Sequence, residues 1–401
     1  MRIGIYISGI NEKSGGAYTF EQGILESLLK LKNKKDLYVF SKFDNEIPQD
    51  TQIKFIKLEK PSVPSPLKRL TRKLLGRMIQ TKNLNEKYYI STLDKAVKIN
   101  KIDILWYATQ YFEPVDIPYI FTVWDLNHRI HPYFPEVSVN KMWLRREEAC
   151  RNIIPRATYI LTGTETGKQE IIKYCNILEK RIKVLPFPAP NKHHLGSKKY
   201  DLKKDFGIQN DYLIYPSAFH PHKNHIRILE ALLVLDKKYG LNYSAVFVGT
   251  DCGNKSYLKQ KCQEFNLESK VKFFKFIPRD QLIYLYQHAF ALVYASYFGP
   301  DNIPPLEAFS FKCPVIASRV SGAEEQLGNK AILVDPNRAE DFAFAVVKLS
   351  KNSKFREQMT ERAFKHVNKW TFNDYTLAAL SLMNKFSSVR SSWGDDINHY
   401  Y

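Results

Sequence analysis

Long apolar segments are missing from this chain of 401 residues. No run of 18 or more uncharged apolar residues occurs, so the sequence predicts no membrane-spanning helix. Met1 and Arg2 lead directly into the strand-like residues 3–7, without the apolar segment and small-residue cleavage site of a secretory signal. We therefore expect a cytoplasmic protein.

Cysteine is scarce and is not arranged for metal binding. The five cysteines form no CxxC pair, and their odd number does not suit a disulfide framework. They are Cys150, Cys175, Cys252, Cys262 and Cys313. His220, His222 and His225 are close in the sequence, but no neighbouring carboxylate or cysteine completes a ligand set. The sequence therefore predicts reduced thiols packed as small hydrophobic residues, with neither a metal nor a disulfide.

Acidic residues are few relative to basic ones. Lys and Arg total 60 against 41 Asp and Glu, which gives a net charge of +19. This balance favours anionic partners, which include phosphorylated substrates, nucleic acid and an acidic membrane surface. The hydrophobic share of 44% and the charged share of 25% are typical of a folded protein, and the length predicts two to three domains.

Much of the excess charge lies in residues 54–82. Within this segment, residues 65–80 place apolar side chains along one helical face and basic side chains elsewhere. The basic residues are Lys68, Arg69, Arg72, Lys73 and Arg77. This pattern is typical of a helix that lies on an anionic membrane surface. The alternative is an ordinary surface helix packed on its own domain.

Strand-like and helical segments alternate along the chain in two series. The first series fills residues 1–190, and the pattern restarts after a Pro- and Lys-rich stretch to fill residues 200–370. Such alternation predicts an α/β fold with two doubly wound parallel-sheet domains that face each other across a cleft. A further amphipathic helix is predicted over 371–386, and residues 387–401 are expected to form a flexible tail.

The second domain carries the more informative polar residues. A strand ends near residue 296 and a turn leads to Pro304, so backbone N–H groups of Asn302 and Ile303 would point into the cleft at a helix start. Glu307, one turn inside, would accept hydrogen bonds from ribose hydroxyls, or it only caps its own helix. Lys223 follows another strand and suits a diphosphate, although a solvated lysine is equally consistent with its local sequence.

The first domain offers weaker signals. Gly15 and Gly16 follow the first strand and allow a close approach of the backbone to a ligand, although a structural turn explains them nearly as well. They are no GxGxxG dinucleotide motif. Asp125 and His128 lie in a loop after the strand-like residues 119–124 and would project into the cleft. The alternative is that Asp125 orders its own loop.

In combination these motifs resemble family 4 glycosyltransferases of the GT-B fold. The resemblance rests on Gly15-Gly16, on HPHKNH around Lys223, and on GPDNIPPLEAFSFKCPVIAS followed by SGAEE and AILVDP. It implies two Rossmann-like domains, a nucleotide-sugar donor held by the second, an acceptor held by the first, and a C-terminal helix that returns to the first. It also implies a retaining reaction without a divalent metal or another cofactor.

Site residues are carried over by position within these motifs. The resemblance implies that Glu307 binds the ribose, that Lys223 binds the diphosphate, and that Gly15 and Gly16 approach the phosphates. Residues that would line the base pocket are Gly249, Phe276 and Ile277.

The chain departs from the family pattern in three places. The family's usual first acid falls on Gly299, so Asp301 is expected to replace its contact with the sugar. The family often has an arginine five residues before the phosphate-binding lysine, and this chain has Ala218 at that position. Where the family usually has a His-Asp pair in the first domain, this chain has Trp124-Asp125. The role of that pair is therefore expected to fall to Asp125, as a catalytic residue, or to His128, on the sugar side.

The expected function is therefore hexosyl transfer from GDP-mannose or a UDP-hexose to a glycan, in cell-surface polysaccharide biosynthesis. A lipid-diphosphate anchor on the acceptor and association with the inner face of the membrane would account for the basic charge. Two other functions remain open: a GT-B epimerase or phosphorylase, and a non-catalytic binder of membrane or nucleic acid. No nucleic-acid-binding motif supports the last of these.

Overall fold

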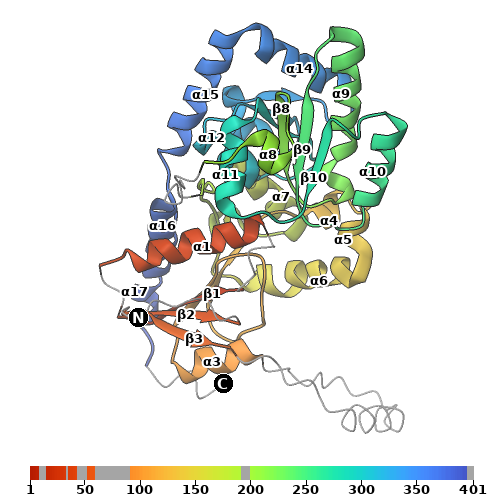
Figure 1. Ribbon diagram of the computed structural model, residues 1–401. Coiled ribbons are helices and arrows are strands. Elements are labelled where there is room, and N and C mark those ends of the chain that lie inside the picture. Colours follow the sequence, from red (N-terminus) through yellow and green to blue (C-terminus); the bar gives the residue numbers. More distant parts are fainter. Residues whose placement is uncertain (9–14, 33–34, 43–51, 59–90, 191–198, 395–401) are drawn as a thin grey trace, which may run out of the picture.

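The computed structural model describes residues 1–8, 15–32, 35–42, 52–58, 91–190 and 199–394 (Figure 1). The predicted basic helix over 65–80 lies outside the described residues, and so does the end of the chain from 395. Within the described residues, no helix is both long and apolar enough to span a membrane.

The first domain is built on a parallel sheet of seven strands in the order β3-β2-β1-β4-β5-β6-β7. Six of these strands were predicted from apolar runs. The edge strand β3 was not, because exposed lysines at both of its ends break the apolar pattern. The strands are β1 (Ile3–Ile7), β2 (Leu37–Ser41), β3 (Lys54–Lys57), β4 (Ile104–Tyr107), β5 (Tyr119–Thr122), β6 (Tyr159–Thr162) and β7 (Ile182–Val184).

The second domain repeats this architecture with six parallel strands in the order β10-β9-β8-β11-β12-β13. The strands are β8 (Tyr212–Pro216), β9 (Ser244–Val248), β10 (Val271–Phe274), β11 (Ala291–Tyr294), β12 (Val315–Ser318) and β13 (Ile332–Val334). In each sheet the winding direction reverses, between β1 and β4 in the first and between β8 and β11 in the second. These are the positions at which doubly wound sheets bind ligands, beyond the carboxyl ends of the strands.

Helices cover both sheets and connect successive strands. In the first domain they include α1 (Gly16–Leu29), α3 (Thr92–Ile99), α4 (Asn127–Ile130), α5 (Pro135–Ser138), α6 (Met142–Glu148) and α7 (Glu165–Cys175). In the second they include α8 (Leu202–Phe206), α9 (His225–Tyr239), α10 (Lys255–Glu264), α11 (Arg279–His288), α12 (Ile303–Ser310), α13 (Ala323–Gln326), α14 (Ala339–Lys351) and α15 (Ser353–Val367). The two-domain α/β prediction is confirmed.

The chain ends on the first domain. Helix α16 (Phe372–Asn384) packs on α1, where the ring of Phe20 lies 5.5 Å from Phe372 and 5.4 Å from Tyr375 (Figure 1). Gly23 makes this packing possible, because a Cβ there would lie 2.5 Å from the Phe372 ring. Aromatic rings buried in this way fix the helix firmly.

The expected flexible tail from residue 387 differs from the structure. Residues Ser387–Arg390 form the short helix α17, and the Arg390 guanidinium lies 2.5 Å from the Asp103 carboxylate. Both side chains are largely shielded from solvent, at 14% and 12% exposure. Polar composition suggested fraying, but an ion pair to a residue 287 positions away holds the segment in place.

Candidate functional site

The clearest site lies at the carboxyl edge of the second sheet. Lys223 follows β8, and its ammonium donates a hydrogen bond to the Tyr294 hydroxyl at the end of β11, at 3.0 Å. Tyr294 in turn donates to the Asn302 side-chain oxygen at 2.7 Å. Asn302 is the N-cap of α12, so the lysine is linked to the start of that helix. Within the described part of the chain, no carboxylate forms an ion pair with this ammonium.

The backbone around Lys223 is held from both sides. Its carbonyl accepts a hydrogen bond from the Tyr215 hydroxyl at 3.0 Å, and the His222 carbonyl accepts one from the Tyr297 N–H at 2.9 Å. Asn224 then adopts a left-handed conformation with φ 56°, which turns the chain into α9. A half-buried ammonium on a fixed backbone is suited to an anion brought to the helix start.

Glu307 is buried on α12 and its carboxylate is oriented by two donors. The Arg279 guanidinium donates to it at 3.1 Å and the Tyr286 hydroxyl donates at 3.0 Å. Both partners belong to α11, and neither was identified from the sequence. A carboxylate has about four acceptor positions, so these two bonds leave capacity for hydroxyl groups of a ligand.

A backbone hydrogen-bond donor at the start of α12 already has a partner within the protein. The Asn302 N–H donates to the Gln326 side chain at 3.1 Å, which corrects the expectation that this donor points to a ligand. Ile303 faces the first domain, because a Cβ on Gly16 would lie 3.3 Å from its side chain. The glycine therefore allows the first domain to lie close to this helix start.

Asp301 also differs from its expected place. Its carboxylate accepts a hydrogen bond from the Gly163 N–H of the first domain at 3.2 Å. A Cβ on Gly163 would lie 2.4 Å from the same carboxylate, so the contact requires glycine. Burial raises the pKa of Asp301 well above its usual range, and nearby Glu325 and Glu170 raise it further. Asp301 therefore forms a contact between the two domains.

The remaining donor-side candidates lie on or near the carboxyl edges of the sheets. A Cβ on Gly249 would lie 2.1 Å from the Ser217 carbonyl, so only glycine fits between β8 and β9 there. Phe276 is exposed and Ile277 packs on the core of the second domain. Gly15 precedes α1 with φ 64°, a conformation that favours glycine. Their roles toward a nucleotide remain predictions.

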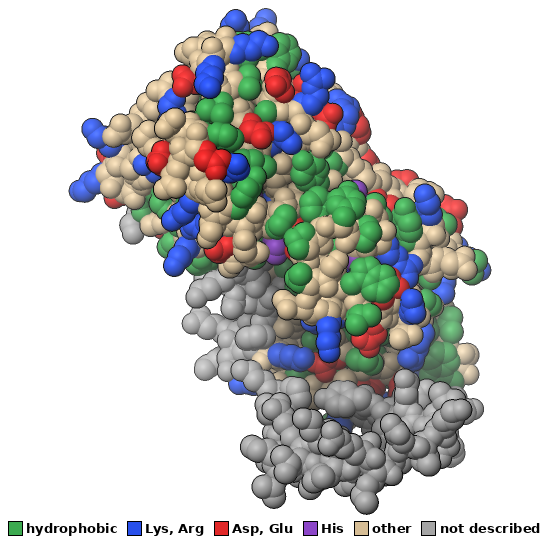
Figure 2. Space-filling view, turned by 90° about the vertical axis from the view of Figure 1, so that its right-hand side faces the viewer, with side chains coloured by type: hydrophobic (Ala, Val, Ile, Leu, Met, Phe, Trp, Pro, Cys, Tyr) green, Lys and Arg blue, Asp and Glu red, His purple; other side chains and the backbone are tan. Residues whose placement is uncertain are grey.

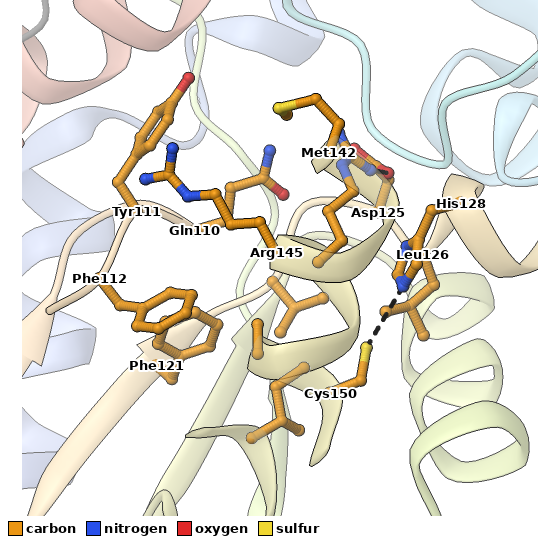
Figure 3. Close-up of a pocket in the computed structure, with 14 residues that line it drawn as sticks. Gln110, Tyr111, Phe112, Phe121, Asp125, Leu126, His128, Met142, Arg145 and Cys150 are labelled. Atoms are coloured by element: carbon orange, nitrogen blue, oxygen red, sulfur yellow. Dashed lines mark hydrogen bonds and ion pairs between the residues drawn. The ribbon is translucent and has the colours of Figure 1, made fainter. Parts of the chain in front are cut away.

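The carboxyl edge of the first sheet contains a cavity of about 110 Å³ (Figure 3). Asp125 lines it and is paired with Arg146 at 2.6 Å, while also accepting from the Asn127 N–H at 3.0 Å. Burial would raise the pKa of Asp125, but Arg146 and the Asn127 N–H outweigh it, and the pKa is lowered. The carboxylate is therefore charged and already partnered.

His128 does not project into an open cleft as the sequence suggested. Its side chain is buried at 1% exposure in the interior of the first domain. The ring Nε2 lies 3.2 Å from the Glu147 carboxylate and 3.7 Å from the Cys150 sulfur. The strand before it was predicted correctly, but α4 turns the histidine inward instead of leaving it in a loop.

Several contacts between the domains involve residues that the sequence did not single out. Glu136 of α5 accepts from the His222 N–H at 2.8 Å and also from the His222 ring. Phe298 stacks between His222 and His131 of the first domain, with centroid distances of 4.1 and 5.5 Å. Glu325 accepts from the first N–H groups of α7, at 2.6 and 3.0 Å. These contacts hold the two carboxyl edges against each other.

Comparison with known proteins agrees with this arrangement. Residues 199–366 match the family described as glycosyl transferases group 1. The O-antigen chain mannosyltransferase RfbU of Salmonella typhimurium is 29% identical over 223 residues, 55% of this chain and 58% of that protein. O-antigen chain mannosyltransferase B of Escherichia coli is 23% identical over 257 residues, 62% of this chain and 65% of that protein. The alignments thus span about three fifths of these relatives.

Solved structures show the same fold. WaaG, a glycosyltransferase involved in lipopolysaccharide biosynthesis, aligns over 95% of this chain and 99% of its own, with a TM-score of 0.67 and 14% identity. HepE of Anabaena in complex with UDP aligns over 96% and 100%, with a TM-score of 0.64 and 15% identity.

Two parallel-sheet domains that meet at their carboxyl edges define the GT-B fold class. The group 1 glycosyl transferase match covers most of the second domain, and the relatives that align over about three fifths of their length are mannosyltransferases.

Proposed function

We propose that the protein transfers a hexose from a nucleotide-diphosphate sugar to a glycan acceptor, with retention of the anomeric configuration, in the synthesis of a cell-surface polysaccharide. Lys223 carries this proposal. Its ammonium has a phenol instead of a carboxylate as its partner and is linked to the start of α12. The donor's diphosphate is the anion that such an arrangement would bind.

The chemistry requires that negative charge growing on the leaving diphosphate be stabilised while the sugar carbon becomes cationic. Lys223 would supply a fixed cation for that charge, and one such donor typically contributes about 2.7–4 kcal/mol. Glu307, oriented by Arg279 and Tyr286, would accept the ribose hydroxyls and position the nucleotide. Because these groups supply the charge and the orientation, we propose that the donor site uses no metal or other cofactor.

Mannose is the sugar that we favour. The two relatives described above carry the name O-antigen chain mannosyltransferase, which supports GDP-mannose ahead of a UDP-hexose as donor. An O-antigen-type acceptor also supports a lipid-diphosphate anchor on the growing glycan. The acceptor would enter from the first domain, beside the cavity that Asp125 and Arg146 line.

Donor identity can be tested by thermal unfolding of the full chain with GDP-mannose, UDP-glucose, GDP and UDP. A ligand that binds only the folded state at 100 times its Kd stabilises it by about 2.7 kcal/mol. We expect the largest rise in Tm with GDP-mannose, and transfer of mannose to a lipid-linked glycan in the same preparation. Equal response to all four nucleotides, or no transfer, would contradict the proposal.

We also propose that the protein associates with the inner face of the membrane. Besides the basic segment around Lys68, Arg69, Arg72, Lys73 and Arg77, exposed apolar and basic side chains follow one another along the chain within residues 133–145, which lead into α6. These are Tyr133, Val139, Lys141, Leu144 and Arg145. Figure 2 shows hydrophobic side chains beside Lys and Arg side chains on one face of the molecule.

Liposome flotation tests the membrane association directly. We expect recovery with vesicles that contain an anionic phospholipid, reduced recovery with neutral vesicles, and loss of binding when Arg69, Arg72 and Arg77 are changed together to Gln. Equal recovery from both kinds of vesicle would contradict an electrostatic attachment.

A further inference from the structure

Three potential metal ligands meet inside the first domain, away from the proposed donor-binding edge. They are His128 of α4, Glu147 of α6 and Cys150 of the π-helical turn Ala149–Ile153, and one ligand atom of each lies within 4.8 Å of the others. The His128 Nε2 lies 3.2 Å from a Glu147 oxygen and 3.7 Å from the Cys150 sulfur. The cluster therefore brings one nitrogen, one oxygen and one sulfur together.

The spacing of these atoms is that of ligands around one small ion. In a tetrahedral zinc site, bond lengths of about 2.3 Å to sulfur and 2.0 to 2.1 Å to nitrogen or oxygen place sulfur and nitrogen roughly 3.6 Å apart, and nitrogen and oxygen roughly 3.3 Å apart. The distances here, 3.7 and 3.2 Å, are close to both values. His128, Glu147 and Cys150 are each at least 95% buried. Three protein ligands leave the fourth position of a tetrahedral zinc ion to a water molecule.

The ligands themselves would balance a divalent ion, because the Cys150 thiolate and the Glu147 carboxylate carry two negative charges. Arg129 and Arg151 also pair with Glu147, Arg151 at 3.1 Å. Arg129 donates to Glu147 at 2.5 and 3.0 Å and also donates to the Tyr174 carbonyl. Hydrogen-bonded partners of this kind orient ligating carboxylates in metal sites.

The histidine is also directed at the cluster. Its Nδ1 is buried without a hydrogen-bond partner among the described residues, so Nε2 makes all the polar contacts of the ring. His128 and Cys150 line the cavity at the carboxyl edge of the sheet (Figure 3). That cavity gives an ion a route to the ligands from solvent.

We propose that His128, Glu147 and Cys150 bind one zinc ion. The ion joins α4, α6 and the turn Ala149–Ile153, and so fixes the wall of the cavity that Asp125 and Arg146 also line. The site is independent of the donor-binding edge and of the proposed transfer reaction. It also differs from the expectation of reduced thiols without a metal, because its ligands come from separate parts of the chain.

The test uses the full chain purified after growth with added zinc, and measures bound metal by elemental analysis. We expect about one zinc per chain, falling below about 0.1 in Cys150→Ser. Cys262→Ser is the matched control, since this thiol is buried at 2% exposure in the second domain, and we expect it to retain the metal.

A second measurement avoids variants that fold poorly. Zinc in the unaltered chain is replaced by Co²⁺, and we expect visible d–d bands together with thiolate-to-cobalt charge-transfer absorption. Absence of metal and of these bands would overturn the proposal. So would unchanged metal content in Cys150→Ser.

Discussion

The carboxyl edges of the two sheets have the same topology, but their charged side chains are paired differently. In the second domain, Lys223 has only a phenol as a partner among the described residues, and Glu307 keeps acceptor capacity beside its two donors. In the first domain, Asp125 is paired with Arg146, and Glu147 is paired with Arg129. An unpaired charge is costly unless a ligand neutralises it, and this supports the proposed binding of an anion at Lys223.

The paired charges of the first domain serve a different purpose. They hold α4 and α6 in place around the cavity and leave its recognition to shape and to polar contacts. This division agrees with a charged nucleotide donor on one side and a glycan on the other. It predicts that changes in the second edge mainly affect transfer, and that changes in the first edge mainly affect stability.

The largest effect is expected from Lys223→Ala. The variant removes the cation opposite the leaving diphosphate, so transfer should fall at least about 100-fold while the fold is retained. Initial rates with GDP-mannose, together with circular dichroism, measure both. Lys270→Ala is the control, because this lysine pairs with Asp236 on the surface of the same domain at 3.0 Å. Unchanged turnover in Lys223→Ala would refute its assignment.

Glu307→Gln should weaken donor binding by roughly 10-fold to 100-fold, because a hydrogen bond to a charged acceptor contributes about 1.5–3 kcal/mol. The loss should appear mainly in the donor KM. A donor with 2′-deoxyribose should be a poorer substrate for the unaltered enzyme and lose that disadvantage in the variant. If the two donors keep the same ratio in both proteins, Glu307 does not bind the ribose. The exposed Glu264→Gln is a suitable control.

Acidification should loosen the contact between the domains. Burial lowers the pKa of His222 to about 3. Below about pH 6.5 the unfolded chain therefore binds a proton at this histidine that the folded chain does not bind. Stability is therefore lost as the pH falls, by about 2 kcal/mol between pH 7 and pH 5 from this group. Urea unfolding at both pH values measures it, and His222→Asn should reduce the difference.

Glu136 acts in a separate pH window. Its pKa is lowered to about 2, where burial acts to raise it but the hydrogen bonds from His222 outweigh burial. Its contribution is present above about pH 4.5 and is lost below that value. Glu136→Gln should therefore flatten the curve only below pH 4.5. A change confined to pH 5–7 in this variant would contradict the pairing.

A smaller effect is expected at the first edge. Asp125→Asn or Arg146→Gln should each lower the free energy of unfolding by about 1–2 kcal/mol, because the pair is half-buried and loses one partner. The double variant should lose less than the sum of the two single changes. Additive losses would show that the two side chains stabilise the domain independently.

Much of the fold could be predicted from the sequence because its signals are local. Apolar runs identified β8 to β13 and six strands of the first sheet, and the Gly-rich and Pro-rich turns separated them. Motif spacing selected Lys223 and Glu307. The edge strand β3 was not predicted, because its alternation is short and its ends are exposed lysines.

Contacts across long separations were not predictable in this way. Asp301 was expected beside a sugar and instead meets Gly163, 138 residues away. His128 was expected in a loop and is buried beside Cys150. Neither contact can be predicted from the neighbouring residues, because each depends on how complete helices pack against another part of the chain.

The amino-acid order by itself therefore determined two successive parallel sheets, the turns that end their strands, and the lysine and glutamate that follow two of them. Only the tertiary structure decided which charges are neutralised, which donors are already used, and that His128 meets Cys150. Periodicity and turn propensity act over a few residues, whereas burial and ion pairing depend on surfaces that form when distant segments pack together.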